Sequence, residues 1–273
     1  MIIVELNVNV DKDLVLSNVV LQKKGPIATL VVNRPKAMNA LNMDTLLDIK
    51  CAVENARDDD DIYVIIITGA GTKSFVAGAD ITFMQELTAV EAREFGILGS
   101  GTCRLIESIE KPVIAAIDGY CLGGGCELAM SCDFRICSDK SKFGQPEVGL
   151  GVTPGFGGTQ RLPRLIGTGL AKQLLYTGET IDSSEAFRSG LVNKVVSSEQ
   201  LMDYVMQIAD TIASKGQRAV DLCKAAVNQG MQTDIDRAMA IELDIFALCF
   251  AMDDQKEGMK AFIEKRKPKF VGK

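Results

Sequence analysis

The sequence predicts an α/β fold followed by a region made only of helices. Two continuous apolar runs, at 62–68 and 112–118, are typical of strands buried on both faces of a sheet. Each run leads into a glycine-rich turn, and apolar residues at helical spacing follow. After about residue 200 no strand-like run remains, and three helices are expected at 199–214, 217–229 and 234–251, with a short one before Pro268.

The first third of the chain carries clear turn and helix signals. Two β-rich runs within 19–33 are joined at Lys24-Gly25-Pro26, which predicts a hairpin. Asp44 is expected to cap a helix whose apolar residues are Leu46, Ile49, Val53 and Ala56. A longer helical region is expected around 95–109, interrupted by Gly99 and Gly101.

The middle of the chain continues the alternation of strands and helices. A short helix is expected to start near Cys126, and a strand is expected at 134–137. Residues 144–158 form a long loop rich in Gly and Pro. Asp182 and Glu185 have the spacing of a helix-capping pair, and 191–196 is expected to be the last strand.

The absence of histidine is the most informative feature of the composition. It excludes nucleophilic systems that depend on histidine and metal sites ligated by histidine. Acid/base chemistry near neutral pH must then use carboxylates, Lys, Tyr or Cys. A carboxylate in this role needs a raised pKa, which burial or a neighbouring negative charge provides.

Charge and hydropathy exclude other classes of function. The formal net charge of −6 argues against a nucleic-acid-binding protein. No apolar run reaches the roughly 18 residues of a membrane span, and the acidic N-terminus does not resemble a signal peptide, so a cytoplasmic location is expected. The eight cysteines lack the spacing of zinc sites and are interpreted as buried, reduced side chains, so no metal is expected.

Three segments could carry chemistry. In 119–127, a buried strand leads through Gly123-Gly124-Gly125 into a helix that carries Glu127 in its first turn, where N–H groups could bind an oxyanion. The segment 75–80 offers a second turn with small side chains. In 143–151, Glu147 lies among apolar residues and glycines, where loss of water would raise its pKa. Taken singly, each segment is also compatible with an ordinary compact turn.

Five segments together resemble the crotonase, or enoyl-CoA hydratase, family, and the match is nearest to its bacterial short-chain members, the 3-hydroxybutyryl-CoA dehydratases. The resemblance covers the chain from about residue 17, which leaves 1–16 as an N-terminal extension, 17–200 as the catalytic core and 201–273 as the helical C-terminal region. The five segments, in chain order, are Asn33–Leu41, Ala77–Asp80, Gly123–Glu127, Gly144–Gly158 and Phe262–Lys267.

The resemblance implies reversible syn addition of water to a trans-2-enoyl-CoA such as crotonyl-CoA, without a cofactor other than the CoA of the substrate. The backbone N–H groups of Ala77 and Gly124 are expected to hold the thioester oxygen. Glu147 is expected to move the C2 proton, and Glu127 to activate the water. Other acyl-CoA reactions of the family (isomerase or thioesterase), and a non-catalytic acyl-CoA- or RNA-binding role, remain alternatives.

The resemblance also implies a fold and partners. The expected fold is a spiral of β-β-α units, with C-terminal helices that build a homotrimer or a hexamer of two trimers. No nucleic acid or membrane is expected as a partner. Phe83, Met84, Phe95 and Leu98 are candidates for the wall of the acyl pocket. Residues expected to contact CoA are Lys36, Ala37, Ala77, Gly78, Ala79, Asp80, Ile81 and Lys265.

Overall fold

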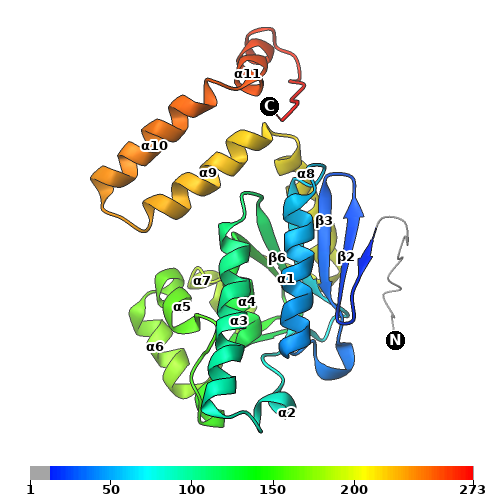
Figure 1. Cartoon of the computed structure of the whole chain (residues 1–273), viewed down its shortest axis with the longest axis vertical. Coiled ribbons are helices and arrows are strands. Elements are labelled where there is room, and N and C mark those ends of the chain that lie inside the picture. The colour runs from blue at the N-terminus through cyan, green and yellow to red at the C-terminus, as the bar shows by residue number, and fades with distance from the viewer. Residues whose placement is uncertain (1–12, 273) are drawn as a thin grey trace.

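The computed structural model describes residues 13–272, in which the strands form two sheets (Figure 1). The larger sheet has the strand order β1-β2-β3-β4-β6-β8-β11, and the smaller has the order β10-β9-β7-β5. The strands of the larger sheet are β1 (Leu14–Val15), β2 (Val19–Lys24), β3 (Ile27–Val32), β4 (Val64–Gly69), β6 (Val113–Ile117), β8 (Phe134–Ser138) and β11 (Lys194–Val196). Those of the smaller sheet are β5 (Ser74–Val76), β7 (Tyr120–Leu122), β9 (Lys142–Gly144) and β10 (Thr180–Asp182).

A repeated β-β-α unit connects the two sheets. In each unit the first strand joins the larger sheet and the second joins the smaller sheet, as in β4–β5, β6–β7 and β8–β9. Successive first strands pair in parallel, and so do successive second strands. A helix follows each pair of strands, so the chain advances by one strand in both sheets per unit. This arrangement confirms the predicted spiral of β-β-α units.

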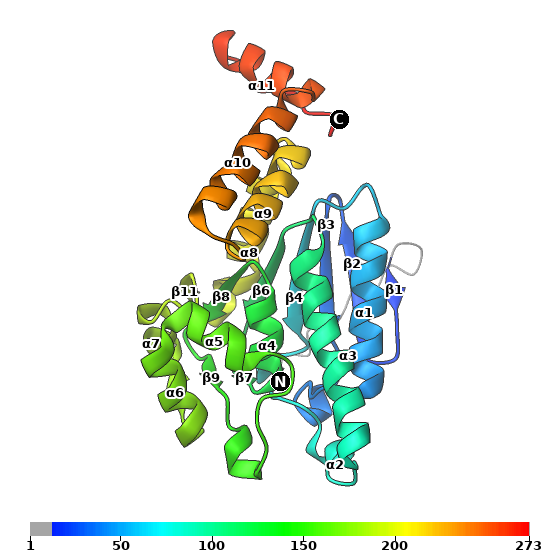
Figure 2. The same cartoon turned by 60° about the vertical axis from the view of Figure 1, so that its left-hand side comes forward.

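The helices cover both faces of the larger sheet (Figure 2). On one face, Ile65 and Ile67 of β4 pack in the same apolar core as α1 and α3, whereas Val64 and Ile66 face the other side, where α8 packs. The predicted burial of this strand on both faces is therefore confirmed. The helices of the core, including 3₁₀ turns (η), are η1 (Pro35–Ala37), α1 (Met43–Asp58), α2 (Ile81–Met84), α3 (Ala89–Ser108), α4 (Gly124–Ser131), η2 (Glu147–Leu150), α5 (Gly158–Ile166), α6 (Thr168–Thr177), α7 (Ser183–Arg188) and η3 (Ser198–Gln200).

The C-terminal region is helical, as predicted. It contains α8 (Leu201–Ala213), α9 (Gln217–Gly230), α10 (Ile235–Cys249) and α11 (Asp253–Ile263). In both views α9 and α10 lie side by side and extend away from the sheets, with α11 beyond them (Figures 1 and 2). Only α8 of this region belongs to the core of the larger sheet.

Two predictions for the helices were wrong in detail. The cap of α1 is Asn42, whose side chain accepts from the Thr45 N–H at 2.9 Å, and Asp44 lies in the first turn instead. The helix α3 runs without a break through Gly99 and Gly101. Gly99 is needed there for space, since a Cβ would lie 2.3 Å from the ring of Phe156.

The predicted N-terminal extension is only partly described, because residues 1–12 lie outside the described part of the chain. Leu14 and Val15 form β1, which pairs antiparallel with β2. Within residues 13–272, no helix is long and apolar enough to span a membrane.

Candidate active site

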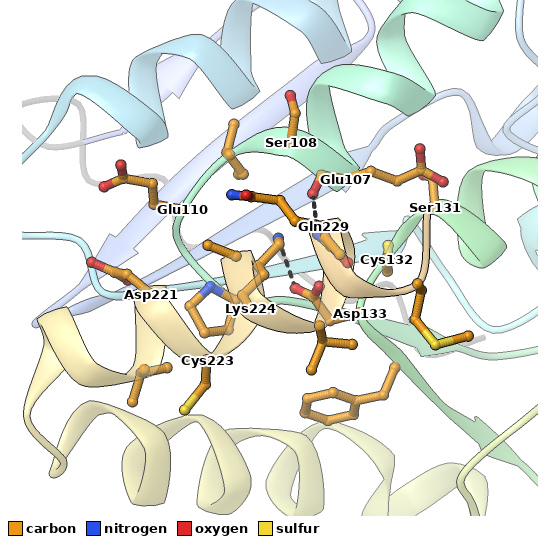
Figure 3. Close-up of a pocket in the computed structure, with 18 of the residues that line it drawn as sticks. Glu107, Ser108, Glu110, Ser131, Cys132, Asp133, Asp221, Cys223, Lys224 and Gln229 are labelled. Atoms are coloured by element: carbon orange, nitrogen blue, oxygen red, sulfur yellow. Dashed lines mark hydrogen bonds and ion pairs between the residues drawn. The ribbon is translucent and has the colours of Figure 1, made fainter. Parts of the chain in front are cut away.

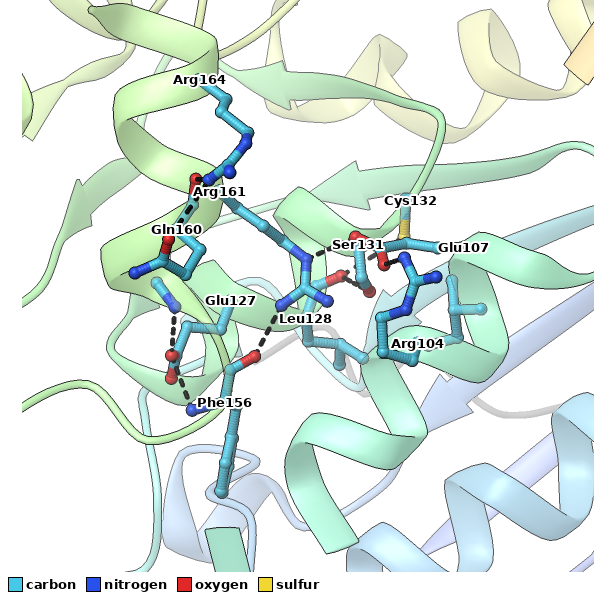
Figure 4. Close-up of polar contacts among 12 residues, drawn as sticks. Arg104, Glu107, Glu127, Leu128, Ser131, Cys132, Phe156, Gln160, Arg161 and Arg164 are labelled. Atoms are coloured by element: carbon cyan, nitrogen blue, oxygen red, sulfur yellow. Dashed lines mark hydrogen bonds and ion pairs between the residues drawn. The ribbon is translucent and has the colours of Figure 1, made fainter. Parts of the chain in front are cut away.

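Glu127 is a buried carboxylate held by backbone N–H groups. It lies in the first turn of α4, and only 1% of its surface is exposed. Its Oε1 accepts from the N–H of Phe156 at 2.8 Å and from the N–H of Gly158 at 2.6 Å (Figure 4). Burial raises the pKa of Glu127, while the two N–H groups and the charge of Arg161 oppose this rise. The two N–H groups thus fix the orientation of the carboxylate, and they stabilise its anion through Oε1.

Glu147 lies in a different environment at the start of η2, and its side chain is partly buried. Burial raises its pKa to about 7, and the negative charge of Glu127 adds to the rise. The amide of Gln145, oriented with its NH₂ toward the carboxylate, donates to Oε1 at 2.9 Å and to Oε2 at 3.2 Å. Burial thus favours the acid form of Glu147, whereas the hydrogen bonds from Gln145 favour its anion.

Gln145 and Gly158 show that the two carboxylates lie near each other. A Cβ at Gly158 would lie 2.9 Å from the side-chain amide of Gln145 and 3.0 Å from Oε1 of Glu127. The buried Gln145 side chain thus approaches both Glu127 and Glu147. The sequence analysis did not single out Gln145, although it directly precedes Pro146-Glu147.

The two glycine-rich turns meet through the smaller sheet. Strand β5 pairs in parallel with β7, with Val76 opposite Cys121. A Cβ at Gly125 would lie 2.0 Å from the carbonyl oxygen of Val76, so this close approach requires glycine. A Cβ at Gly123 would lie 2.9 Å from Oε1 of Glu147 and 3.7 Å from Cα of Gly78, so both turns border the Glu147 carboxylate.

The hydrogen bonds of the first turn contradict the prediction for Ala77. Its N–H donates to the carbonyl oxygen of Met38 at 3.1 Å and is therefore not free for a ligand. The N–H of Ala79 has no acceptor among the described residues, although its neighbours on both sides bond to Leu41. In the second turn, the N–H of Gly124 opens α4 and likewise has no acceptor in the described chain. Ala79 in the first turn and Gly124 in the second therefore each have an N–H group that is free to bind a ligand.

Leu41 contacts both of the turns that carry these donors. It forms an isolated parallel bridge with Ala79, and its Cδ1 would lie 3.5 Å from a Cβ at Gly124. The ring of Phe156 would lie 3.0 Å from the same Cβ. The ring of Phe156 packs edge-to-face against Phe95, and Phe95 packs in the same way against Phe83. The ring centroids are 5.2 Å apart in both pairs. Of the residues suggested for the acyl wall, Phe95 and Phe83 therefore continue a row of rings that begins at Phe156 beside Gly124, and the sequence analysis missed Phe156.

The segment 33–41 is fixed to the first turn by buried polar contacts. Asn39 is fully buried, and its amide donates to the carbonyl oxygens of Ala70 at 3.1 Å and Ser74 at 2.8 Å. Arg34 pairs with Asp80 at 2.9 Å, and Asp80 also caps α2. The side chain of Lys36 is exposed beside this segment. Lys36, Ala37 and the 77–81 segment therefore border one region of the surface.

Lys265 lies far from this region within one chain. It directly follows α11, whereas Ile81 begins α2, and α11 and α2 are at opposite ends of the molecule in both views (Figures 1 and 2). Lys36 and Lys265 of the same chain therefore do not share a ligand.

A large cavity lies away from the two glutamates. It has a volume of about 870 Å³ and lies between α9 and the ends of α3 and β8 (Figure 3). The amine of Lys224 is directed into it and is bound by Asp133 at 2.9 Å and by the carbonyl oxygen of Lys111 at 3.0 Å. Within residues 13–272, no cluster of Cys, Asp or Glu side chains has the arrangement of a metal site.

The pattern of the Enoyl-CoA hydratase/isomerase family matches residues 22–273. The chain belongs to this family. It is 67% identical to a crotonyl-CoA hydratase of Syntrophomonas wolfei over 94% of this chain and 98% of that protein. It is 56% identical to a short-chain-enoyl-CoA hydratase of Clostridium acetobutylicum over 92% of this chain and 97% of that protein.

Solved structures of the enoyl-CoA hydratase family have the same fold. A crystal structure of an enoyl-CoA hydratase from Bacillus anthracis superposes with a TM-score of 0.92 at 37% identity, over 94% of this chain and 100% of that one. An enoyl-CoA hydratase from Geobacillus kaustophilus gives a TM-score of 0.93 at 34% identity, over 96% of this chain and 99% of that one. The fold and the family predicted from the five sequence segments are thereby confirmed.

Proposed function

We propose that this protein is a short-chain enoyl-CoA hydratase, which adds water to trans-2-enoyl-CoA thioesters such as crotonyl-CoA and catalyses the reverse dehydration. The observation that carries the proposal is the pair of nearby carboxylates with different environments. Burial raises the pKa of both carboxyl groups, to about 7 for Glu147, but Glu127 also accepts two backbone N–H groups, which oppose the rise and favour its anion. The family membership and the names of the two close relatives support the same reaction.

The reaction needs one group that accepts a proton and one that donates a proton. In hydration, the Glu127 carboxylate takes a proton from water as the oxygen bonds to C3, and the Glu147 acid delivers a proton to C2. The N–H groups of Ala79 and Gly124 would bind the thioester oxygen, on which negative charge develops. Dehydration reverses each transfer. No electrons are exchanged with a second reactant, so we infer that no cofactor is needed beyond the CoA of the substrate.

The activity should depend on pH in the same way in both directions. Hydration moves one proton from Glu147 to the substrate and one from water to Glu127, so the pair carries one proton before and after the reaction. Loss of that proton inactivates both directions. We expect kcat/KM for hydration and for dehydration to fall together above a pH of about 7, by about tenfold per pH unit, because the pKa of Glu147 is about 7.

Steady-state rates with crotonyl-CoA and 3-hydroxybutyryl-CoA across this pH range would check the prediction. Crotonyl-pantetheine, which has no phosphate groups, serves as the control because titration of CoA cannot affect its profile. Profiles that are flat through neutral pH, or a ratio of the two kcat/KM values that changes with pH, would contradict this account.

We also propose that the protein is a homotrimer or a hexamer. An apolar stripe of side chains at helical spacing runs along α10 and its C-terminal cap, and it remains exposed in the single chain. A stripe of this size on a soluble protein usually marks a contact surface. Its members are Ile235, Met239, Leu243, Phe246 and Phe250, each at least 45% exposed. Within one chain Lys265 lies far from Lys36. A neighbouring subunit could instead supply its Lys265 to the CoA site that contains Lys36.

Replacing one aromatic side chain of the stripe should break this contact. In Phe246→Asp we expect dissociation toward monomers, because burying an unpaired carboxylate at the interface is unfavourable. We also expect a raised KM for crotonyl-CoA, because a separated subunit would no longer receive Lys265 from its neighbour. Light scattering coupled to gel filtration gives the mass. Phe187→Asp is the matched control, since Phe187 is also exposed but lies on α7. A monomeric wild-type protein would refute the oligomer, and an unchanged mass in Phe246→Asp would refute the role of the stripe.

A further inference from the structure

The guanidinium of Arg161 contacts the backbone that holds Glu127. Arg161 lies on α5, and its Nη1 donates to the carbonyl oxygen of Phe156 at 2.6 Å (Figure 4). The N–H of Phe156 donates to Oε1 of Glu127, as does the N–H of Gly158. Arg161 therefore binds the same residue whose N–H orients the carboxylate.

Gly157 lies between these two donors and must be glycine, both for its backbone conformation and for the space that Arg161 occupies. Its φ of +104° is in the left-handed region, and a Cβ there would lie 2.2 Å from Nη1 of Arg161. The guanidinium thus covers the outer side of the turn, while the carboxylate of Glu127 occupies its inner side. The turn is held between two charged groups of opposite sign.

Arg161 is itself anchored by α3. Its Nε donates to Oε1 of Glu107 at 2.5 Å, and Arg104 binds the other oxygen at 2.7 Å. The Arg161 and Glu107 side chains are only 13% and 23% exposed. Although burial favours the neutral carboxyl group, the hydrogen bond and charge of Arg161 lower the pKa of Glu107, so the pair is ionised. The guanidinium therefore makes a fixed bridge from α3 to the 156–158 turn.

A bridge between α3 and α5 would also be made by a purely structural ion pair. Two observations favour a further role. The guanidinium bonds to Phe156, which precedes α5, rather than to a residue within the helix. The charge of Arg161 also opposes the rise in pKa that burial causes at Glu127. The other ionisable groups that act on this region are Glu147 and the Cys103 thiol, which remains neutral because burial raises its pKa to about 12.

We propose that Arg161, anchored by Glu107, is a positioning residue that fixes the Phe156–Gly158 turn so that its N–H groups orient Glu127 for activating water. The inference rests on the proposed hydratase function and assigns a role to a residue outside the substrate contacts. Without this bridge the turn can relax, and the carboxylate loses its fixed orientation. A displacement of about 1 Å can lower the rate roughly 10²-fold.

The test compares variants of the full-length protein. In Arg161→Gln we expect kcat for crotonyl-CoA hydration to fall roughly 10²-fold with little change in KM. Arg161→Lys should recover part of the rate, because an amine can bond to Phe156 or Glu107 but lacks the fork that reaches both. Arg164→Gln is the matched control, since Arg164 lies on the same helix and is exposed. It should behave as wild type.

The double variant Glu107→Gln with Arg161→Gln addresses folding, because it removes the ion pair without leaving one buried charge unpaired. Its kcat should remain as low as that of Arg161→Gln. Its pH profile should also change, since loss of the positive charge raises the pKa of Glu127 and moves the acidic limb, below which Glu127 is protonated and cannot accept a proton, to higher pH. Wild-type kcat in the folded double variant, or a defect confined to KM or to melting temperature, would overturn the proposal.

Hydrogen–deuterium exchange gives a measurement that does not depend on turnover. The amides of 155–160 should exchange faster in Arg161→Gln and in the double variant than in wild type or Arg164→Gln. Unchanged exchange in this segment would refute the positioning role whether or not the protein is a hydratase. Failure of the hydratase proposal, in contrast, would already appear as absent turnover in the wild-type protein.

Discussion

Glu127→Gln should lower kcat/KM for crotonyl-CoA hydration by roughly 10²- to 10⁴-fold, the usual contribution of a general base. The amide has the same shape, and its oxygen can still accept the N–H groups of Phe156 and Gly158. It cannot take a proton from water. The loss should therefore appear in turnover, while folding and the mass of the oligomer stay as in wild type.

The control for this variant is Glu199→Gln, a change of the same chemistry at an exposed glutamate on η3. Rates are measured with crotonyl-CoA at fixed pH, and thermal melting reports folding. Turnover close to wild type in a folded Glu127→Gln protein would remove this residue from the mechanism.

Glu147→Gln should cause a loss of similar size, roughly 10²- to 10⁴-fold, because the amide cannot supply the C2 proton. Burial and the nearby charge of Glu127 raise the pKa of Glu147, so the native side chain is well suited to give and take a proton near neutral pH. The amide also removes a titrating group, and the alkaline limb at a pH of about 7 should vanish from any residual activity.

Exchange of the C2 protons of butyryl-CoA with heavy water would separate the two roles. This saturated thioester has no double bond to hydrate, so exchange needs only the group that moves the C2 proton. We expect Glu127→Gln to retain exchange and Glu147→Gln to lose it. The opposite pattern would reverse the assignment of the two glutamates.

The fold was largely predictable because its strands have local signals. The strand at 64–69 begins with four consecutive apolar residues, Val64–Ile67, which are buried on both faces of the larger sheet. Strands β5 and β7 were missed since each has three residues within a glycine-rich turn and exists only by pairing with the other. Helices α5 and α6 were also missed, because Pro163 lies inside α5 and Gly167 separates the two.

The candidate site was predictable only in part. Glu127 and Glu147 were singled out by their unusual local setting, but the choice of Ala77 as a donor was wrong. The four residues Ala77-Gly78-Ala79-Asp80 do not reveal which N–H is free. That depends on Met38, which takes the N–H of Ala77, and on the position of Leu41. Arg161 was missed for a related reason, since its contacts with Glu107 and Phe156 are tertiary.

The most direct test of the central claim is the product formed from crotonyl-CoA by the wild-type protein in labelled water, without added cofactor. We predict 3-hydroxybutyryl-CoA that carries one oxygen from water at C3 and, in heavy water, one deuterium at C2, with no release of free CoA. Mass spectrometry of the thioester gives both labels. Unchanged crotonyl-CoA, a thioester with a shifted double bond, or free CoA would contradict the account.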